Sequence, residues 1–288
     1  WEASTFNQDL SGWCVSHIST SPTRFNTSSG LSTENLPNWG AACIPEYLPA
    51  SGLVAWYPFN GNANDESGNG YNGTPDGAVL TTDRNGEINS SYEFDGNNDW
   101  IDFTAHSGLK QIGSLTYSAW INYNGMTNFM GIVGVGEGTA WNKTSSILMI
   151  NTDDIPLFEI GNGVRDDMIK TFDESVSLEQ NNWYHLTATF DSGNEIKLYL
   201  NGALISEEST SIISLLSNIS DSDNTFKIGV RDRLTSGYTY GWFNGKIDDV
   251  GVWNRTLTTT EVAQLYTGRV DTTAPTVALS HSASETEI

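Results

Sequence analysis

The sequence predicts an all-β protein, a two-sheet antiparallel jelly-roll sandwich, and three observations support this fold class. Short segments of alternating apolar and polar residues follow one another from about residue 50 to 269, which is the pattern of half-buried strands. The chain contains 28 glycines, several of them in Asn-Gly pairs that favour tight hairpin turns. Hydrophobic residues make up 38% of the chain and aromatic residues 11%, so the chain can build a core.

The segment 183–191 shows the alternation most clearly. Tyr184, Leu186, Ala188 and Phe190 are expected on one face of this strand, and Trp183, His185, Thr187 and Thr189 on the other. A further strand at 195–200 ends at Asn201-Gly202, which turns the chain back into 203–205. At least ten strands are expected, the others including 53–59, 91–103, 115–123, 146–150, 226–230 and 246–253.

Tryptophans on these periodic strands are expected in the core, namely Trp120, Trp183 and Trp253. One short helix is expected near the end of the sandwich. Thr258 and Glu261 have the spacing of a capping box, and Gly268 is a stop signal. The helix would close the edge of the domain.

Composition divides the chain into three parts. Residues 1–48 are polar and lack strand periodicity, residues 50–269 form the sandwich, and residues 270–288 are interpreted as a linker that enters another strand. The chain begins without an initiator Met, so we expect a processed piece of a longer protein. No run of eighteen apolar residues is present, so no membrane insertion is expected.

The charge is strongly negative, with 35 acidic against 13 basic residues and a net charge of −22. Such a field repels nucleic acid and anionic membrane surfaces, and no basic stripe offsets it. We therefore expect no nucleic-acid partner. An acidic surface also suits solubility in salt and attracts divalent cations.

Two cysteines, Cys14 and Cys43, lie in the first part of the chain without a CxxC motif or a histidine cluster. A zinc site is therefore not expected. A disulfide is the preferred interpretation, and two free thiols are the alternative. The disulfide would contribute roughly 3 kcal/mol on the chain-entropy model and would indicate an oxidising, extracytoplasmic location.

Several motifs of the middle part together resemble the bacterial laminin-G-like, concanavalin A-like jelly-roll domains. They are GLVAWYPFNGNAND (52–65), FDGNNDWI (94–101), YSAWI (117–121), WYHL (183–186), KLYLNG (197–202) and FNGKIDDV (243–250). The resemblance covers about 220 residues. It implies two curved antiparallel sheets, often a structural calcium ion, and roles in glycan binding and adhesion.

The flanking parts resemble other modules of bacterial surface proteins. Residues 6–16 and 37–43 are similar to the last repeat and cap of a leucine-rich-type repeat array. Residues 270–288 resemble the start of an immunoglobulin-like repeat. The resemblance implies a large secreted or cell-surface adhesin, in which neighbouring domains of the same chain are partners.

A calcium site is expected where oxygen ligands are dense, because Ca²⁺ binds six to eight oxygens. The segment 60–70 is rich in Asn and Asp, and the resemblance implies a metal carboxylate on the last strand. The expected ligands are Asn60, Asp65 and Asp248; the family pattern usually has Asp where Asn60 stands. The alternative is that these residues only build turns.

A ligand surface is expected where aromatic residues lie off the strand pattern, because sugar rings stack on aromatic faces. The candidates are Trp141, Arg231, Tyr238, Tyr240 and Trp242, with Arg231 placed to hold a carboxylate or sulfate of an anionic glycan. The alternative is that the arginine pairs with a neighbouring aspartate and the aromatic rings fill the ends of the sandwich.

No catalytic residues are expected. The E-x-D-x-E-like triplet of related hydrolases is missing, as is a G-x-S-x-G motif, and His185 is expected to be a buried structural histidine. We therefore predict a non-enzymatic, carbohydrate-binding adhesion module. A structural spacer, or less favourably a glycoside-hydrolase-related enzyme, is the alternative, since this fold serves all three.

Overall fold

The computed structural model describes 6–10, 13, 15, 18, 20–27, 29–40, 44–103, 106–110, 113–125, 128–136, 146–161, 168–209, 225–231 and 241–268. Cys14 and Cys43, the expected disulfide pair, lie outside these residues, and so does the segment 270–288. The described part of the N-terminal section contains one short 3-10 helix, η1 (Thr33–Asn35). The rest of the regular structure belongs to the sandwich.

The first sheet has eight strands and carries the longest elements of the chain. Its order is β13 (Ala203–Ser209), β12 (Glu195–Leu200), β11 (Trp183–Asp191), β6 (Leu115–Tyr123), β17 (Asn244–Trp253), β4 (Ser91–Asp95) and β3 (Val79–Thr81), with β1 (Leu53–Tyr57) also paired to β17. All of these described pairs are antiparallel. The first strand of the sandwich, β1, therefore lies beside the last strand, β17.

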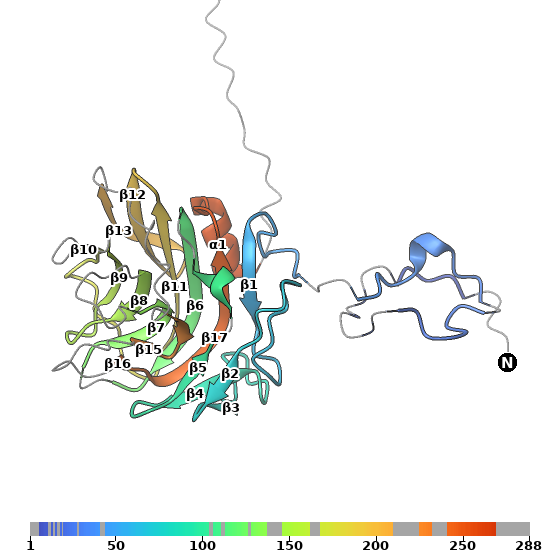
Figure 1. Ribbon diagram of the computed structural model, residues 1–288, viewed down its shortest axis with the longest axis horizontal. Coiled ribbons are helices and arrows are strands. Elements are labelled where there is room, and N and C mark those ends of the chain that lie inside the picture. The colour runs from blue at the N-terminus through green and yellow to red at the C-terminus, as the bar shows by residue number, and fades with distance from the viewer. Residues whose placement is uncertain are drawn as a thin grey trace, which may run out of the picture.

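The second sheet has seven strands and packs against the first (Figure 1). Its order is β10 (Met168–Thr171), β9 (Pro156–Gly161), β8 (Ser146–Ile150), β7 (Met130–Val135), β14 (Phe226–Ile228), β5 (Trp100–Asp102) and β2 (Thr74–Asp76). The 3-10 helix η2 (Ser107–Leu109) follows β5. A small third sheet pairs β15 (Val230–Arg231) with β16 (Gly241–Trp242).

The space between the two large sheets is filled by one hydrophobic core. Aromatic rings from both sheets meet there: Tyr117 of the first sheet lies 6.0 Å from Phe226 and 6.2 Å from Phe158 of the second, between ring centroids. Each such side chain contributes about 1.5–3 kcal/mol by leaving water. The all-β antiparallel sandwich predicted from the sequence is confirmed.

Two segments expected as single strands are each divided between elements. Residues 91–103 form β4 in the first sheet and β5 in the second, because a turn with Gly96 at φ 79° separates them. The Asp99 carboxylate closes this turn by accepting a hydrogen bond from the Asp95 amide at 2.9 Å. Residues 226–230 are likewise broken at Gly229, whose φ is 87°. At the first break the chain passes from the first sheet to the second, and at the other break it passes from the second sheet to the small third sheet.

The expectation that all three strand tryptophans lie in the core was wrong for two of them. Trp120 and Trp183 are half-buried on the outer face of the first sheet. Trp253 is fully buried, but in a second cluster outside the sandwich core. The alternation of β6 and β11 explains this, because Ala119 and Leu186 face the core and their neighbours must face outward.

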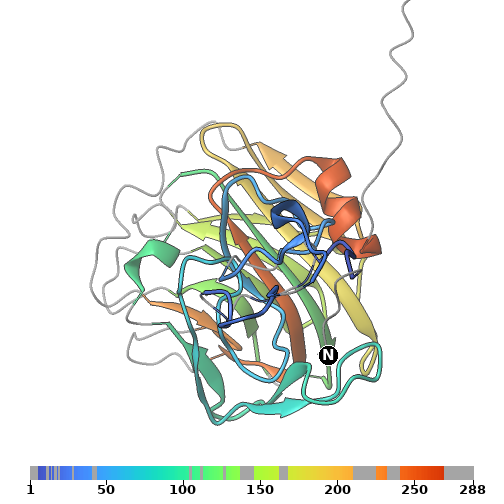
Figure 2. The same ribbon diagram turned by 90° about the vertical axis from the view of Figure 1, so that its right-hand side faces the viewer.

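The second cluster lies between the first sheet and the helix α1 (Thr259–Thr267). Viewed from the side in Figure 2, the segment before β1 lies on the same side of the first sheet as this helix. The residues that form the second cluster are Ile44, Tyr47, Leu48, Leu53, Trp56, Tyr199, Trp253, Leu257, Val262 and Leu265. Residues 44–48 therefore pack as part of the sandwich, although the composition grouped them with the N-terminal section.

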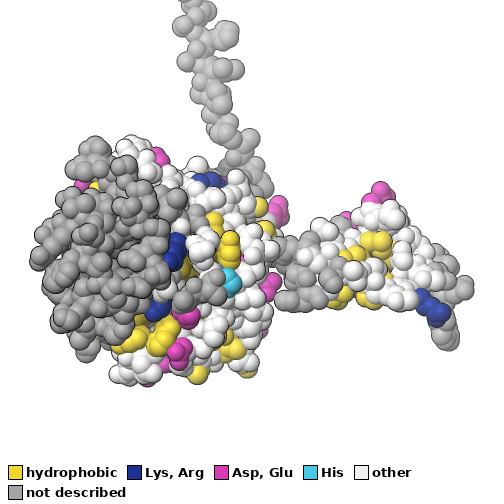
Figure 3. Space-filling model, in the orientation of Figure 1, with side chains coloured by type: hydrophobic (Ala, Val, Ile, Leu, Met, Phe, Trp, Pro, Cys, Tyr) yellow, Lys and Arg dark blue, Asp and Glu magenta, His cyan; other side chains and the backbone are white. Residues whose placement is uncertain are grey.

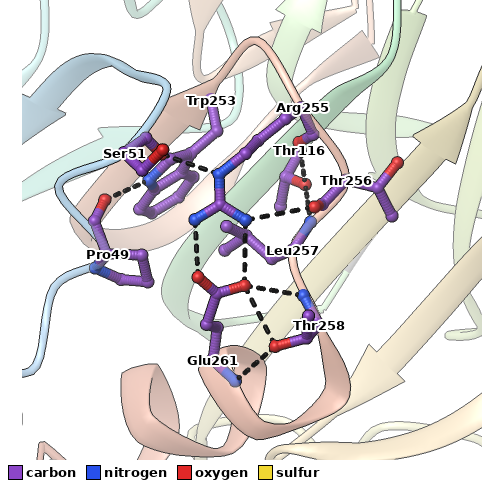
Figure 4. A network of polar contacts seen from close by, with 9 residues as sticks. All are labelled: Pro49, Ser51, Thr116, Trp253, Arg255, Thr256, Leu257, Thr258 and Glu261. Atoms are coloured by element: carbon purple, nitrogen blue, oxygen red, sulfur yellow. Dashed lines mark hydrogen bonds and ion pairs between the residues drawn. The ribbon is translucent and has the colours of Figure 1, made fainter.

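A polar network fixes α1 and the entry of β1 to the end of β17 (Figure 4). The capping box expected at Thr258 and Glu261 is present, and Gly268 ends the helix in a left-handed conformation with φ 64°. Arg255 donates to the Glu261 carboxylate at 2.9 and 2.5 Å and to the Ser51 carbonyl at 2.7 Å. The Trp253 indole N–H donates to the Pro49 carbonyl at 2.7 Å.

Across the part of the chain that the structure describes, no helix has the length and apolar character needed to cross a membrane.

Candidate ligand-binding sites

Two of the five expected ligand residues, Arg231 and Trp242, are brought together on the small β15–β16 sheet. In its register, Val230 lies opposite Trp242 and Arg231 lies opposite Gly241. The other three, Trp141, Tyr238 and Tyr240, lie outside the described residues.

Arg231 is held in an ion pair beside the second sheet. Its side chain is only 9% exposed, and its Nη2 atom lies 3.4 Å from Glu159 Oε1. The Glu159 carboxylate, 1% exposed, also meets the Lys170 ammonium at 3.3 Å. The Arg231 guanidinium lies 5.1 Å from the centre of the Phe129 ring, in a cation–π contact. These contacts favour a role for Arg231 in holding the β15–β16 sheet in place.

Trp242 is one half of a pair of stacked tryptophans. Its ring centroid lies 5.5 Å from that of Trp100, with an angle of 29° between the ring planes. Both side chains are half-buried, so part of each indole is open to solvent. The Lys227 ammonium lies 5.5 Å from the Trp100 ring centre, and Lys227 is paired with Asp102 across β14 and β5. We call Trp100, Trp242, Lys227 and Asp102 the tryptophan face.

The sequence analysis missed Trp100, although the signal was present. Ile101 and Phe103 belong to the core, so the alternation of this short strand directs Trp100 and Asp102 outward. Trp100 was instead grouped with a structural motif. A paired indole surface with an ammonium and a carboxylate at its edge can stack on C–H-rich rings and hydrogen bond to hydroxyl groups.

A separate pocket of about 680 Å³ opens on the side of the first sheet. Among its lining residues, the polar ones come from the loops around residues 60–66 and 83–90 and from β17: Asn60, Asn62, Asn64, Glu66, Asp83, Arg84, Asn85, Glu87, Ser90, Asp248 and Asp249. Tyr47, Trp56 and Phe59 supply aromatic surface. Two of the three expected calcium ligands, Asn60 and Asp248, therefore lie in one pocket.

Asp65, the third expected calcium ligand, organises the loop behind this pocket. The residue is 8% exposed. Its Oδ1 atom accepts hydrogen bonds from the Trp56 amide at 3.1 Å and the Ser67 amide at 2.9 Å, and its Oδ2 atom accepts from the Tyr71 amide at 3.0 Å. Both carboxylate oxygens are thus used by the backbone.

Asp248 is engaged in a similar way. Its Oδ2 atom lies 2.7 Å from Arg84 Nη1, and its Oδ1 atom accepts the Asp249 amide at 2.8 Å. Burial and the neighbouring Asp249 raise the pKa of Asp248, and Arg84 opposes this rise. Asn60 is exposed.

These contacts do not fit a shared calcium site on Asn60, Asp65 and Asp248. The Arg84 guanidinium already neutralises Asp248 and would repel a calcium ion there, and the Asp65 carboxylate already accepts three backbone N–H groups. Within the described ranges, no group of three or more His, Cys, Asp or Glu residues is placed to hold a metal ion. Calcium binding stays a prediction.

Comparisons with known proteins extend this picture. The family model described as the concanavalin A-like lectin/glucanases superfamily matches residues 95–263. No curated protein matches the chain, and the comparisons give no evidence for the leucine-rich-type repeat expected in residues 1–48.

Several solved structures share the fold. The receptor binding domain of botulinum neurotoxin C/D mosaic serotype is 17% identical, with a TM-score of 0.56, and the match covers 77% of this chain and 52% of that one. The binding domain of botulinum neurotoxin DC in complex with SialylT is 12% identical, with a TM-score of 0.53, at 76% and 52% coverage. The chain thus spans about half the length of these toxin domains.

A smaller relative in structure is domain 4 of AbnA, a GH43 extracellular arabinanase from Geobacillus stearothermophilus, in complex with arabinotriose. It is 18% identical, with a TM-score of 0.53, and the match covers 74% of this chain and 98% of that one. At these identities the likeness shows the fold alone. The family model, however, matches more than half of the chain. The chain therefore belongs to the concanavalin A-like lectin/glucanases superfamily.

Proposed function

We propose that this chain is a non-enzymatic glycan-binding module of a secreted or cell-surface protein, and that the tryptophan face is its binding site. The observation that carries the proposal is the half-buried stacked pair of Trp100 and Trp242. Two large aromatic side chains left partly open to water mark interaction sites more often than scattered surface residues do. The Lys227 ammonium lies over the Trp100 ring, Asp102 is opposite Lys227 in the register of β5 and β14, and both side chains can hydrogen bond to sugar hydroxyl groups.

Structures of the same fold give independent support, because their titles name carbohydrate ligands. One toxin binding domain is in complex with SialylT, another with N-acetylneuraminic acid, and the arabinanase domain with arabinotriose. The arabinanase is an extracellular enzyme, which agrees with the secreted location proposed here.

The charge of the chain favours a neutral glycan. The net charge of −22 repels polyanions at long range, and Arg231, the residue expected to hold an acidic group, is paired with Glu159. In Figure 3 the described Lys and Arg side chains on the visible face lie singly rather than in a continuous basic area. We therefore expect neutral polysaccharides to bind better than sulfated or sialylated ones.

A glycan array followed by calorimetric titration with the best neutral oligosaccharide tests the proposal. Trp100→Ala and Trp242→Ala are each expected to weaken binding about tenfold or more, because each removes a stacking ring. Trp13→Ala is the matched control, since Trp13 is 55% exposed and lies in the N-terminal section; its affinity should equal that of the unaltered chain.

The alternatives give different results in the same experiment. A structural spacer binds no glycan on the array. A hydrolase shortens the oligosaccharide during incubation, and the release of new reducing ends would reveal it. Glycan binding that survives both tryptophan substitutions together would place the site elsewhere.

A further inference from the structure

Two consecutive acidic residues, Asp248 and Asp249, point to the same side of β17. Side chains of a regular strand alternate between faces, but the register of β17 against β6 shifts between Asp248 and Gly251. Asp249 has a φ of 47° at this bulge. Bulges redirect side chains in this way, and here the bulge places two carboxylates together in the wall of the pocket.

The Arg84 guanidinium spans both carboxylates. Its Nη1 atom lies 2.7 Å from Asp248 Oδ2, and its Nη2 atom lies 2.6 Å from Asp249 Oδ2. The exposed fractions of the side chains are 23% for Arg84, 3% for Asp248 and 15% for Asp249. Charge-assisted hydrogen bonds of this length in a partly dry site are strong, and the planar fork of arginine suits two acceptors.

The Arg84 guanidinium makes a third contact, with a tryptophan ring on the first sheet. It lies 4.5 Å from the centre of the Trp120 ring, and Trp120 is paired with Asp248 across β6 and β17. Tyr266 of α1 stacks on the same indole with 5.6 Å between ring centroids. Arg84 is thus held between two acids and an aromatic ring, and it joins the loop after β3 to β17.

We propose that Arg84 is a built-in counter-ion that takes the place of a bound metal ion in the wall of this pocket. The carboxylate oxygens that a calcium ion would need on Asp248 already accept hydrogen bonds from Arg84 and the Asp249 amide, and an added cation would be repelled by the guanidinium. The domain is therefore stable without calcium. Removal of Arg84 converts Asp248 and Asp249 into a site that binds divalent cations.

Thermal unfolding and calcium titration of the unaltered chain form the first test. Its melting temperature is expected to be the same in EDTA and in excess calcium. Calorimetry is expected to give the same calcium binding for the unaltered chain and for Asp248→Asn. A melting temperature that falls in EDTA, together with calcium binding lost in Asp248→Asn, would overturn the proposal.

The second test uses Arg84→Gln. In EDTA its melting temperature is expected to fall by roughly 5–10 °C, because two adjacent carboxylates lose their partner, and calcium should restore part of this loss. Arg84→Lys keeps a cation and should show no calcium response. Arg24→Gln, which changes an exposed arginine of the N-terminal section, is the control and should melt unchanged.

Adding Asp248→Asn to Arg84→Gln should remove the calcium rescue. An Arg84→Gln variant that folds and gains nothing from calcium contradicts the proposal. If the Arg84→Gln variant does not fold, the proposal is contradicted by an Arg84→Lys variant whose melting temperature rises with calcium. Glycan binding at the tryptophan face is measured separately, so either proposal can fail alone.

Discussion

His185 shows how the neighbours of one residue determine its protonation. It lies on the outer face of β11 but is only 2% exposed, with Trp120 and Tyr266 at ring-centroid distances of 5.2 and 6.1 Å. Its Nε2 atom hydrogen bonds with the Ser118 hydroxyl at 2.8 Å. Burial lowers the pKa of His185 to about 3, and Arg84 contributes to the shift. The ring is therefore neutral at physiological pH.

This depressed pKa predicts a loss of stability in acid. In the unfolded chain His185 binds a proton near its ordinary pKa of 6.5, whereas the folded state takes one only near pH 3. The free energy of unfolding should therefore fall by up to about 1.4 kcal/mol per pH unit as the pH drops from 6.5 toward 3. Denaturant unfolding of the unaltered chain and of His185→Gln between these pH values measures the effect.

The comparison with His185→Gln is necessary because Asp248 acts in the opposite direction. Burial raises its pKa, so its contribution to stability is largest in acid and weakens as the pH rises. The variant keeps Asp248 and loses the histidine. Parallel pH profiles for the two proteins would contradict the assignment to His185.

Single residues were predicted from the sequence only where local pattern determined them. Trp242 was singled out because it lies off the strand alternation, and His185 was expected to be a buried structural histidine, which its 2% exposure confirms. The partnership of Arg84 with Asp248 could not be predicted, because it joins residues 164 positions apart and depends on a bulge that leaves no local signal. The assignment of Asp248 to calcium came from the family resemblance, which carries no information about Arg84.

At the scale of elements, the tryptophan face depends on how closely β15 approaches β7. Gly131 of β7 makes this approach possible: a Cβ atom on it would lie 2.2 Å from the Arg231 amide nitrogen and 2.3 Å from the Val230 carbonyl carbon. Both are backbone atoms, which cannot rotate away. The absence of a side chain at Gly131 therefore allows the β15–β16 pair, which carries Trp242, to pack close to β7.

Gly131→Ala is expected to push β15 away from β7 and to weaken glycan binding. We expect a loss of about 1–3 kcal/mol in the free energy of unfolding, as for other overpacked sites, together with a lower affinity for the best neutral oligosaccharide. Gly113→Ala is the control, because nothing lies within 4 Å of the added Cβ. If both variants bind the oligosaccharide with equal affinity, Gly131 does not contribute to the binding site.

Strands with one polar face were predicted, whereas several short strands and several strands covered on both faces were missed, although the fully buried β8 was predicted. β11 has a clear alternation and was predicted with its faces. All six residues of β7 are buried, so its sequence carries no alternation. β2 and β3 have three residues each, too few to show a period. Tertiary packing, rather than the local pattern, defines these elements.

At the scale of the whole molecule, the packing boundary of the sandwich lies before Ile44. Leu48 is 3% exposed in the cluster with α1, and Pro49 accepts the Trp253 indole hydrogen bond. A chain starting at Ile44 is expected to melt like the full chain. A chain starting at Ser51 loses both contacts and should melt several degrees lower.

Differential scanning calorimetry of the three chains checks this expectation. A chain from Ser51 that melts with the other two would show that residues 44–50 contribute no stability. A chain from Ile44 that melts well below the full chain would show that the N-terminal section supports the sandwich.

The antiparallel pairing of β1 with β17 determines how the protein responds to mechanical tension. Leu53 lies opposite Trp253, so the chain enters and leaves the sandwich at the same end. Once α1 had been detached, a pull on the two flanking segments would open this pair from that end, one hydrogen bond after another. The bonds from Trp253 to Pro49 and from Arg255 to Ser51 lie at the point where such an opening would begin. These two hydrogen bonds therefore reinforce the strand pair at its most exposed end.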